Sequence, residues 1–260
     1  MKKYQLLIIV VTLIFAVGLV GCGSSDSESK PFEKHPMPYV NGYMSDWGAT
    51  SYDGCDDHFD SPYWKPQDVY NMESTDSLTV LPKFETYQQS TEYSCGAATA
   101  LMVLNHYDNT DYDEAAVVKK ADVSDETGVG VDGLEKFFKG IGWKVERSKA
   151  GAFTFDWDKD GEAASKFTKW VQDNLKDGTP IMVDWLDWAG HWQAIIGYDT
   201  MGTDEMGDDV IIMADPYDTS DHYQDGYFVV PAERFFHMWR EGVSTKKKPE
   251  QQPWIFAKPK

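Results

Sequence analysis

One cysteine lies at the boundary between a polar segment and an apolar run, within QQSTEYSCGAATALMVL at residues 88–104. Alanine, leucine and methionine in helical periodicity predict a helix over residues 95–107, with Cys95 in its first turn. The unpaired backbone N–H groups and the positive dipole at the start of a helix favour the thiolate, which is the nucleophilic form of cysteine. Cys95 is therefore a candidate nucleophile, and the small residue Gly96 leaves its neighbourhood open to a substrate.

Gln89 lies six residues before Cys95. Its side-chain amide can swing beside the backbone N–H of Cys95, and the two groups together would supply two hydrogen-bond donors. Such a pair of donors stabilises the oxyanion that forms when a thiolate attacks a carbonyl carbon. We therefore expect Gln89 to serve as an oxyanion donor.

A thiolate nucleophile works with a general base, and the chain contains six histidines. His191 follows two small residues and opens the strongest predicted strand, HWQAIIGYD at 191–199, which would hold it rigidly at the rim of a sheet. His106 lies on the predicted helix of Cys95, but the helical rise separates the two residues by about 16 Å. The weaker candidates lie in irregular, loop or aromatic segments: His35, His58, His222 and His237.

An aspartate ends the next apolar strand, in DVIIMADP at 209–216. If this strand and 191–199 form a hairpin, Asp215 comes to lie beside His191, because the end of one strand meets the start of the other. A carboxylate in that place orients the imidazole and fixes its tautomer, as catalytic triads require. Asp-Pro pairs also initiate turns, so a purely structural role for Asp215 is the alternative.

The order of the predicted elements indicates the fold class. Helices are predicted over residues 95–107, 111–121, 131–142, 162–176 and 231–240. Strands are predicted over residues 143–148, 179–186, 191–199, 209–216 and 226–231, with an edge strand in PWIFAKP at 253–259. Helices that precede a meandering, mostly antiparallel sheet are typical of an α+β fold.

The composition excludes some classes of partner. The chain is 42% hydrophobic and 14% aromatic, which is enough to fill a core. Its formal net charge of -19 disfavours binding to nucleic acid, and the sequence has no polybasic patch for anionic lipid. We therefore expect no nucleic-acid partner.

The first residues have the features of a lipoprotein signal. Met1-Lys2-Lys3 is a short basic segment, residues 4–20 are apolar, and LVGC at 19–22 follows at once. The small residue before a cysteine resembles the bacterial lipobox, which implies removal of residues 1–21 and a lipid on Cys22. We expect a protein anchored by that lipid to a bacterial cell membrane, on its extracytoplasmic side. An uncleaved membrane anchor is the alternative.

Composition divides the rest of the chain into three segments. Residues 22–34 are polar and of low complexity, which is typical of a flexible tether. Residues 35–80 are aromatic, acidic and rich in turn residues without a clear period, so we expect an irregular, packed N-terminal extension. The periodic patterns begin at residue 81, and residues 81–260 are predicted to form the domain that carries Cys95 and His191.

Two acidic segments are candidates for metal binding. DGCDDHFD at 53–60 groups carboxylates with a histidine, but its spacing matches no metal motif. DWDKDGEAA at 156–164 opens like a calcium loop, but Phe167 takes the position where the motif requires glutamate, so capping of the next helix is favoured. We expect no metal and no cofactor. Since disulfides are permitted outside the cytoplasm, a Cys55–Cys95 bridge is the structural alternative for Cys95.

Four motifs occur in the order found in papain-like cysteine peptidases: Gln89, Cys95-Gly96, GHW at 190–192 and ADP at 214–216. More narrowly, these motifs resemble the bacteriocin-processing peptidases (peptidase family C thirty-nine) and their single-domain extracytoplasmic relatives, over residues 81–240. The resemblance implies a papain-like cysteine peptidase fold, in which the helix bearing the nucleophile packs on a mostly antiparallel sheet. The transporter domains of bacteriocin processors have no counterpart here, so a double-glycine leader substrate is not implied. Ala97 stands where many relatives have proline.

Carried over position by position, the resemblance implies these roles: Cys95 as nucleophile, His191 as base and acid, Asp215 as orienting residue and Gln89 as oxyanion donor. A substrate cleft would be bordered by Gly96, Gly190 and Trp192. Residues 81–260 would then be a cysteine peptidase-like domain.

The residues and the resemblance together favour a thiol hydrolase that cleaves peptide bonds through an acyl-enzyme. Transfer of the acyl group to another acceptor is one alternative, because the steps up to the acyl-enzyme are the same. A non-catalytic module that binds peptide through Trp185, Trp188 and Trp192 is the other. We expect a peptide or protein substrate, and the sequence predicts neither its identity nor an oligomeric state.

Overall fold

The computed structural model describes residues 32–40, 42–45, 47–51, 57–59, 61–242 and 250–260. The predicted signal peptide at 1–21, the predicted lipidation residue Cys22 and also Cys55 lie outside the described residues, as does most of the predicted tether at 22–34. Within the described ranges, no helix combines the length and the apolar character needed to cross a membrane.

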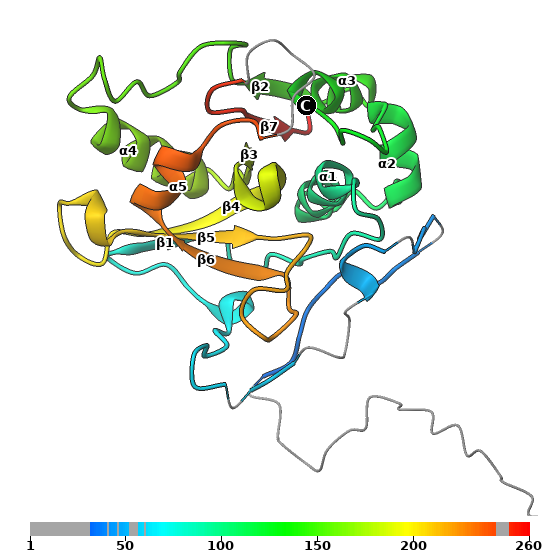
Figure 1. The fold of residues 1–260 in the computed structure, drawn as a ribbon, viewed down its shortest axis with the longest axis horizontal. Helices are drawn as coiled ribbons and strands as arrows, with labels where there is room; N and C mark the ends of the chain where they lie inside the picture. The colour runs from blue at the N-terminus through cyan, green and yellow to red at the C-terminus, as the bar shows by residue number, and fades with distance from the viewer. Residues whose placement is uncertain (1–31, 41, 46, 52–56, 60, 243–249) are drawn as a thin grey trace, which may run out of the picture.

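A seven-stranded sheet forms the centre of the described part of the chain (Figure 1). Its strands are β1 (Leu78–Val80), β2 (Lys144–Arg147), β3 (Ile181–Trp185), β4 (His191–Asp199), β5 (Val210–Ala214), β6 (Tyr227–Pro231) and β7 (Trp254–Lys258). Across the sheet the order is β2-β7-β3-β4-β5-β6, and β1 pairs with the far end of β4. Every pairing is antiparallel, so consecutive strands such as β3, β4 and β5 bring the start of one strand close to the end of the next.

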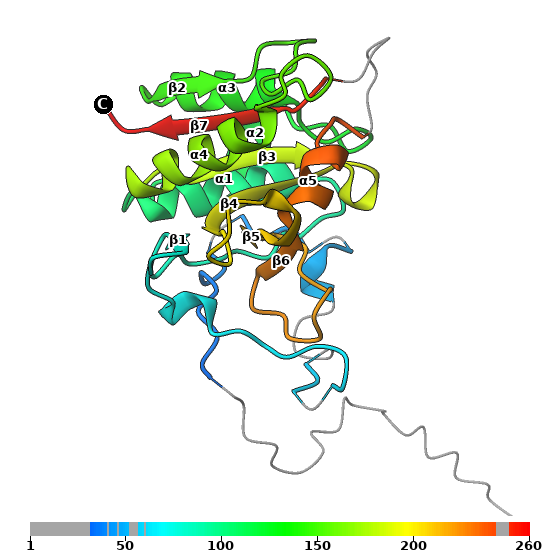
Figure 2. The same cartoon turned by 90° about the vertical axis from the view of Figure 1, so that its left-hand side faces the viewer.

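Helices cover both faces of the sheet. They are α1 (Cys95–His106), α2 (Glu114–Ala121), α3 (Val131–Gly140), α4 (Ala163–Lys176) and α5 (Ala232–Met238). Short 3₁₀ turns occur at Ala49–Ser51, Val69–Asn71, Asp187–Ala189 and Met206–Asp208. Figures 1 and 2 show α1, α2 and α3 on one face and α4 and α5 on the other. The predicted α+β class and the predicted helices are thus confirmed, with bounds that differ by a few residues.

Two predictions about strands need correction. The C-terminal strand β7 was expected at an edge, but it lies between β2 and β3, and residues Trp254 to Ala257 are buried. The apolar run WIFA is explained by this interior position. Within the segment 35–80, which was expected to be irregular, β1 is a strand paired with β4. Three residues are too few to show a strand periodicity in the sequence.

The remainder of the segment 35–80 that the structure describes packs on the domain without regular strands. The backbone N–H of Met37 donates a hydrogen bond of 2.6 Å to the carbonyl of Thr86. The ring of His35 stacks on that of Tyr70, with 3.7 Å between the ring centroids. The first contact holds the extension against the polar segment that precedes α1, and the second joins two parts of the extension itself.

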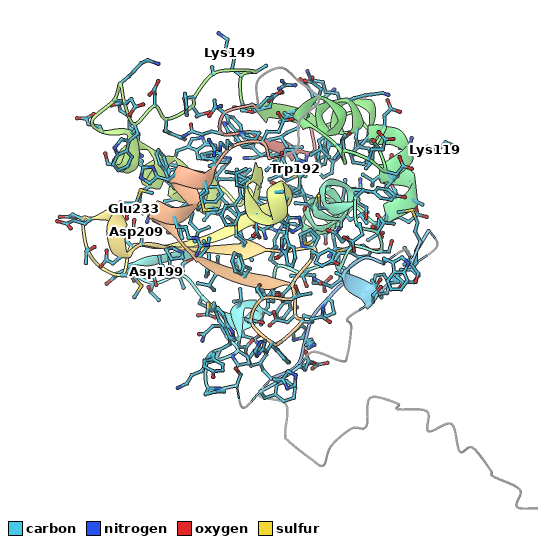
Figure 3. All side chains as sticks on the ribbon, in the orientation of Figure 1. Lys119, Lys149, Trp192, Asp199, Asp209 and Glu233 are labelled. Carbon is cyan, nitrogen blue, oxygen red and sulfur yellow. The ribbon has the colours of Figure 1, made fainter. Side chains whose placement is uncertain are left out.

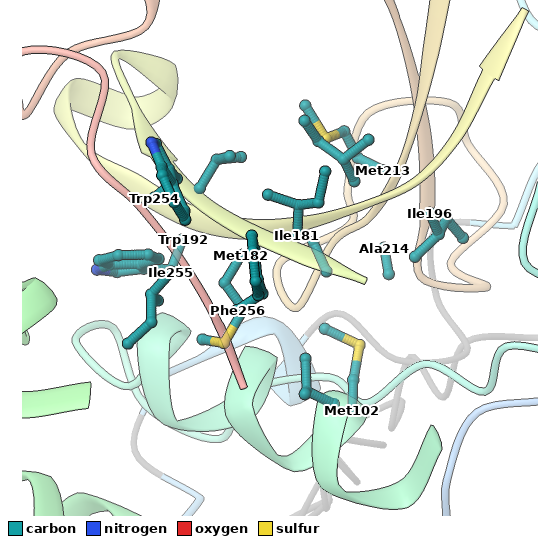
Figure 4. Close-up of a cluster of buried hydrophobic side chains, with 14 of the residues drawn as sticks. Met102, Ile181, Met182, Trp192, Ile196, Met213, Ala214, Trp254, Ile255 and Phe256 are labelled. Atoms are coloured by element: carbon teal, nitrogen blue, oxygen red, sulfur yellow. The ribbon is translucent and has the colours of Figure 1, made fainter. Parts of the chain in front are cut away.

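The core lies between the central strands and the helices on either face. Helix α1 contributes only small or apolar side chains over residues 96–104, and all nine residues are buried. Met102 of α1 faces Ile181 and Met182 of β3 and residues of β4 and β5 in the cluster drawn in Figure 4. Figure 3 shows the contrast between Trp192, which lies inside, and the outward-pointing Lys119 and Lys149. The alanines of α1 let the helix approach β4 closely, which fixes where Cys95 lies.

A buried threonine links the first turn of α1 to the start of β4. The Thr99 hydroxyl lies 2.8 Å from the carbonyl oxygen of Cys95 and 2.9 Å from that of Trp192. Because a hydroxyl carries one proton, it donates to one carbonyl at a time, and both lie within reach. The contact couples the helix that carries Cys95 to the strand that begins with His191.

Gly96 is the point of closest approach between α1 and its neighbours. A Cβ atom at this position would lie 2.3 Å from Cγ1 of Val129 and 3.1 Å from Cδ1 of Trp192. Both neighbours belong to the packed interior, so neither can move without disturbing other contacts. The role of Gly96 is therefore close packing beside Cys95.

We predict that Gly96→Ala lowers the free energy of unfolding by about 1–3 kcal/mol, because the added methyl overpacks the interface. The matched control is Gly140→Ala, at the end of α3, where a Cβ meets no atom within 4 Å. That control should be neutral or slightly stabilising, because alanine favours helix. Urea unfolding of both variants measures the difference, and equal stabilities would contradict the packing role.

Candidate active site

His191 and Asp215 meet at one end of the β4–β5 hairpin. His191 is the first residue of β4 and Asp215 directly follows β5, and the two strands are paired in antiparallel register with Ala194 opposite Ala214. Nε2 of His191 lies 2.7 Å from Oδ1 of Asp215, and the two side chains are 5% and 2% exposed. The predicted hairpin is confirmed, and the bond leaves Nδ1 as the ring nitrogen that faces elsewhere.

The Cys95 side chain completes this chain of contacts. Its thiol lies close enough to the imidazole of His191 to raise the pKa of that ring, and Cys95 is a half-buried, free cysteine at the start of α1. Since Nε2 is engaged with Asp215, the nitrogen that faces the sulfur is Nδ1. Cys95 is thus free in the structure, while Cys55, the partner considered for a disulfide, lies outside the described residues.

The surroundings of His191 favour its protonated form. Burial alone would lower the pKa of His191, but the charge and hydrogen bond of Asp215 and the contact with Cys95 raise that pKa well above its usual value of 6.5. An imidazolium held this way can pair with a thiolate. Such a pair is the reactive state of cysteine nucleophiles that have a histidine partner.

Gln89 lies in the segment just before α1 and is buried. Its backbone N–H donates to the carbonyl of Pro216 over 2.7 Å, and its side-chain amide donates to the carbonyl of Thr91 over 2.6 Å. The amide nitrogen carries two hydrogens, so the bond to Thr91 leaves one for another acceptor. Its Oε1 is buried without a hydrogen-bond partner in the described part of the chain. These contacts fix the amide in place, and no hydrogen bond between Gln89 and Cys95 is present.

Gln88 holds the other side of the site and was not predicted from the sequence. Its Nε2 donates to the carbonyl of Asp215 over 2.9 Å, and its Oε1 accepts from the backbone N–H of Asp218 over 3.2 Å. The backbone on both sides of Tyr217 is thus tied to the segment that leads into Cys95. The sequence signal that could have found Gln88 is the pair Gln88-Gln89 before a buried helix. The sequence does not show which of these two glutamines faces which strand.

A cleft of about 290 Å³ opens beside the nucleophile. Cys95, Gly190 and Trp192 line it, as the sequence suggested for the last two. Gly96 does not line it, because Gly96 is buried against Val129 and Trp192. The indole Nε1 of Trp192 donates to the carbonyl of Val129 over 2.7 Å, which fixes one wall of the cleft.

The acidic loop at 156–164 has partners within the chain. Asp156 pairs with Lys159, and Asp160 pairs with Lys166 while accepting the backbone N–H of Glu162. The side chain of Glu162, the residue before α4, forms no capping hydrogen bond, so the acidic cap expected from the sequence is not formed, and the carboxylates of the loop pair with neighbouring lysines instead. In the residues that the structure describes, no cluster of three or more His, Cys, Asp or Glu side chains could hold a metal ion.

A model of the Peptidase_C39 like family matches residues 82–245. The chain belongs to this family. The match spans α1, β4 and β5, so Cys95, His191 and Asp215 all lie within it. The helix and antiparallel sheet described above are the α+β, papain-like fold of a C39-like peptidase.

One solved structure similar to this C39-like domain is the peptidase domain of Streptococcus ComA, a bifunctional ABC transporter involved in a quorum-sensing pathway. The two share 18% sequence identity with a TM-score of 0.43, over 68% of this chain and 99% of the ComA domain. No protein in a comparison with curated proteins matches the chain.

A buried glutamate anchors the segment that carries the C39-like domain's cysteine. The carboxylate of Glu114, at the start of α2, accepts four hydrogen bonds and is fully buried. The donors are the backbone N–H of Ser90 (3.1 Å), Oγ of Ser90 (2.6 Å), Oγ of Ser94 (2.6 Å) and the hydroxyl of Tyr87 (3.1 Å). Ser94 is the residue before Cys95, so this carboxylate fixes the backbone on the N-terminal side of the nucleophile.

The sequence did not identify Glu114, because an acidic residue in the first turn of a helix is ordinarily a solvent-exposed partner of the helix dipole. The signal that could have found it is the group of hydroxyl-bearing residues directly before a buried helix: Ser90, Thr91, Tyr93 and Ser94. Buried hydroxyls need acceptors, and a carboxylate supplies several at once.

We predict that Glu114→Ala lowers the free energy of unfolding by about 3 kcal/mol or more, because it leaves four buried donors without an acceptor. Glu114→Gln should be milder, since the amide keeps the shape and one strong acceptor. Glu73→Ala, at an exposed position, is the control and should be within about 0.5 kcal/mol of the unchanged protein. Urea unfolding measures all three, and a small effect of Glu114→Ala would contradict the anchoring role.

Proposed function

We propose that this protein is a thiol hydrolase that cleaves peptide bonds, with Cys95 as nucleophile, His191 as base and acid, and Asp215 as the residue that orients the imidazole. The observation that carries the proposal is the continuous chain of contacts from the Cys95 sulfur through the His191 ring to the Asp215 carboxylate. Its position beside a cleft and its place within the family match support the same function.

The reaction follows from the roles of these groups. The thiolate of Cys95 attacks the carbonyl carbon of the scissile amide, and a tetrahedral oxyanion forms. His191 then gives its Nδ1 proton to the leaving nitrogen, which departs as an amine and leaves a thioester on Cys95. Water, deprotonated by the now neutral His191, attacks the thioester, and the acid product leaves as the thiolate and imidazolium are restored.

The oxyanion needs donors that point at the place where charge develops. The backbone N–H of Cys95, in the first turn of α1, is one candidate, because the first N–H groups of a helix have no partner within it. The second N–H of the Gln89 amide is the other. Its fixed orientation, set by the bond to Thr91, supports a preorganised donor.

Asp215 maintains the charge on His191. It holds Nε2, keeps the ring in one orientation, and stabilises the imidazolium that the ion pair requires. The free thiol and the complete set of partners favour a catalyst over a module that only binds peptide.

The proposed location is the outer face of a bacterial cell membrane, with the protein held by a lipid on Cys22 after removal of residues 1–21. The support is the order of basic segment, apolar run and lipobox-like LVGC in the sequence. A lipid anchor of this kind would leave the C39-like domain free to meet peptide or protein substrates outside the cell.

We predict that iodoacetamide at neutral pH alkylates Cys95 at least about tenfold faster than it alkylates a free thiol such as glutathione, because the imidazolium stabilises the thiolate. His191→Asn should reduce the rate to that of a free thiol. Peptide mapping separates Cys95 from the other two cysteines. An ordinary rate for Cys95, or peptide hydrolysis that persists in Cys95→Ala, would contradict the proposed nucleophile.

We predict that Asp215→Asn moves the alkaline limb of the pH–activity profile to lower pH. The carboxylate raises the pKa of His191, so its removal lowers that pKa, and the imidazolium is lost at a lower pH than in the unchanged protein. Cleavage of a quenched fluorescent peptide pool from pH 5 to 10 measures the limb. A limb that stays in place would show that Asp215 does not support the charge on His191.

We predict that Cys22→Ser moves the protein from the detergent phase to the aqueous phase in detergent partitioning of expressing bacteria, because the lipid attachment atom is absent. Cys55→Ser is the control and should partition like the unchanged protein. If the unchanged protein is already aqueous, the proposed anchor is wrong.

A further inference from the structure

The lining of the cleft beside Cys95 is acidic. The described residues place no lysine or arginine in its lining. Five carboxylate-bearing residues line it: Glu92, Asp125, Glu126, Asp184 and Glu241. None of the five forms an ion pair with a cationic lysine or arginine side chain in the part of the chain that the structure describes. Among the residues that the structure describes, no lysine or arginine neutralises the negative charge of this cleft.

Asp184 is the most constrained of these carboxylates. It lies on β3 opposite Trp192 of β4, it lines the cleft, and it is only 8% exposed. Burial and the charges of Glu241 and Glu250 raise the pKa of Asp184 to about 7. The charge and the backbone N–H of His191 act in the opposite direction and lower that pKa. A buried carboxylate beside another is unfavourable, and an incoming cation would relieve both the desolvation and the repulsion.

Glu241 is held at the same end of the cleft. Its carboxylate accepts the backbone N–H of Glu250 over 2.9 Å, which limits its movement. The next residue, Gly242, packs so tightly that a Cβ there would lie 1.8 Å from the carbonyl oxygen of Ala189. Glu241 and the turn at Ala189, which precedes His191, are therefore fixed relative to each other.

Trp188 adds an aromatic surface to the lining of the cleft. It lines the cleft and is 68% exposed, which is unusual for a side chain of this size. Its φ of 50° and the φ of 70° at Ala189 place two non-glycine residues in the left-handed region, and the indole packs beside the ring of Tyr217 at 5.7 Å. An exposed indole next to carboxylates suits a long cationic side chain, whose stem packs on the ring while its charge meets both.

We infer that this cleft is a subsite for a lysine or arginine side chain of the substrate, bound by Asp184 and Glu241 against Trp188, so that the enzyme prefers peptides with a basic residue close to the scissile bond. The inference rests on the proposed function for the position of the scissile bond. The cationic subsite itself rests on the geometry of the cleft. A free metal cation is the competing occupant, and the test separates it.

The first experiment measures peptide preference. A set of quenched peptides of one sequence carries lysine, arginine, norleucine, glutamine or glutamate at each position from three before to three after the cleaved bond, and kcat/KM is measured for each. We expect at one position a preference of at least about tenfold for lysine or arginine over norleucine and glutamine, which is the effect of one charge-assisted contact. Asp184→Asn and Glu241→Gln should each reduce that ratio, and Glu241→Arg should shift it towards the glutamate peptide.

The second experiment needs no hydrolysis. Methanethiosulfonate reagents of similar size with an ammonium, a neutral or a sulfonate group react with Cys95, and their relative rates report the charge of the cleft. We expect the ammonium reagent to be the fastest, and the ratio of ammonium to neutral rates to fall in Asp184→Asn and Glu241→Gln. A ratio cancels any general change in thiol reactivity that the variants cause through His191. Glu73→Gln, at an exposed position, controls for the overall negative charge and should leave the ratio unchanged.

The outcomes are distinct. Peptide cleavage without any preference for basic residues, or a rate ratio that the cleft variants do not change, overturns the subsite while the proposed hydrolase stands. An intact rate ratio with no cleavage of any peptide overturns the hydrolase while the cationic subsite stands. If added calcium abolishes the ammonium preference and EDTA restores it, the cleft binds a metal ion in preference to a side chain, and the inference is wrong.

Discussion

The hydrogen bond between His191 and Asp215 is the interaction on which the rest of the site depends. Both side chains are buried, and a buried charge is tolerated only with a partner at good geometry. The antiparallel β4–β5 hairpin supplies that geometry, because it places the start of one strand beside the end of the next. Gln88 then ties the Asp215 backbone to the segment before α1, so the carboxylate is held from two directions.

The nucleophile reaches the imidazole through close packing rather than through flexible contacts. Alanines on α1 and the absence of a side chain at Gly96 let the helix lie directly against β4, and Thr99 bridges the two backbones. On the other side, the buried Glu114 gathers the hydroxyls that precede Cys95. The sulfur is thus positioned by a core, a hydroxyl and a buried carboxylate, none of which takes part in the chemistry.

The sequence predicted the parts of this arrangement that depend on local pattern. The helix from Cys95 and the strand from His191 follow from local periodicity, and the hairpin that brings Asp215 to His191 follows from two such strands separated by a short loop. The position of β7 inside the sheet could not be predicted in this way, because interior and edge strands are distinguished by partners from distant parts of the chain. The same reason explains why Glu114 and Asp184 were missed. Their burial depends on where α2 and β3 pack, and an acidic residue in isolation is expected to be exposed.

Nitrogen NMR of the histidine side chains decides whether His191 is kept protonated between Asp215 and Cys95. The signals of His191 are assigned among the six histidines by comparison with His191→Asn. We expect that at pH 7.5 both ring nitrogens of His191 carry protons and that the ring titrates well above pH 6.5. A neutral imidazole at pH 7.5, or a titration close to 6.5, would contradict it.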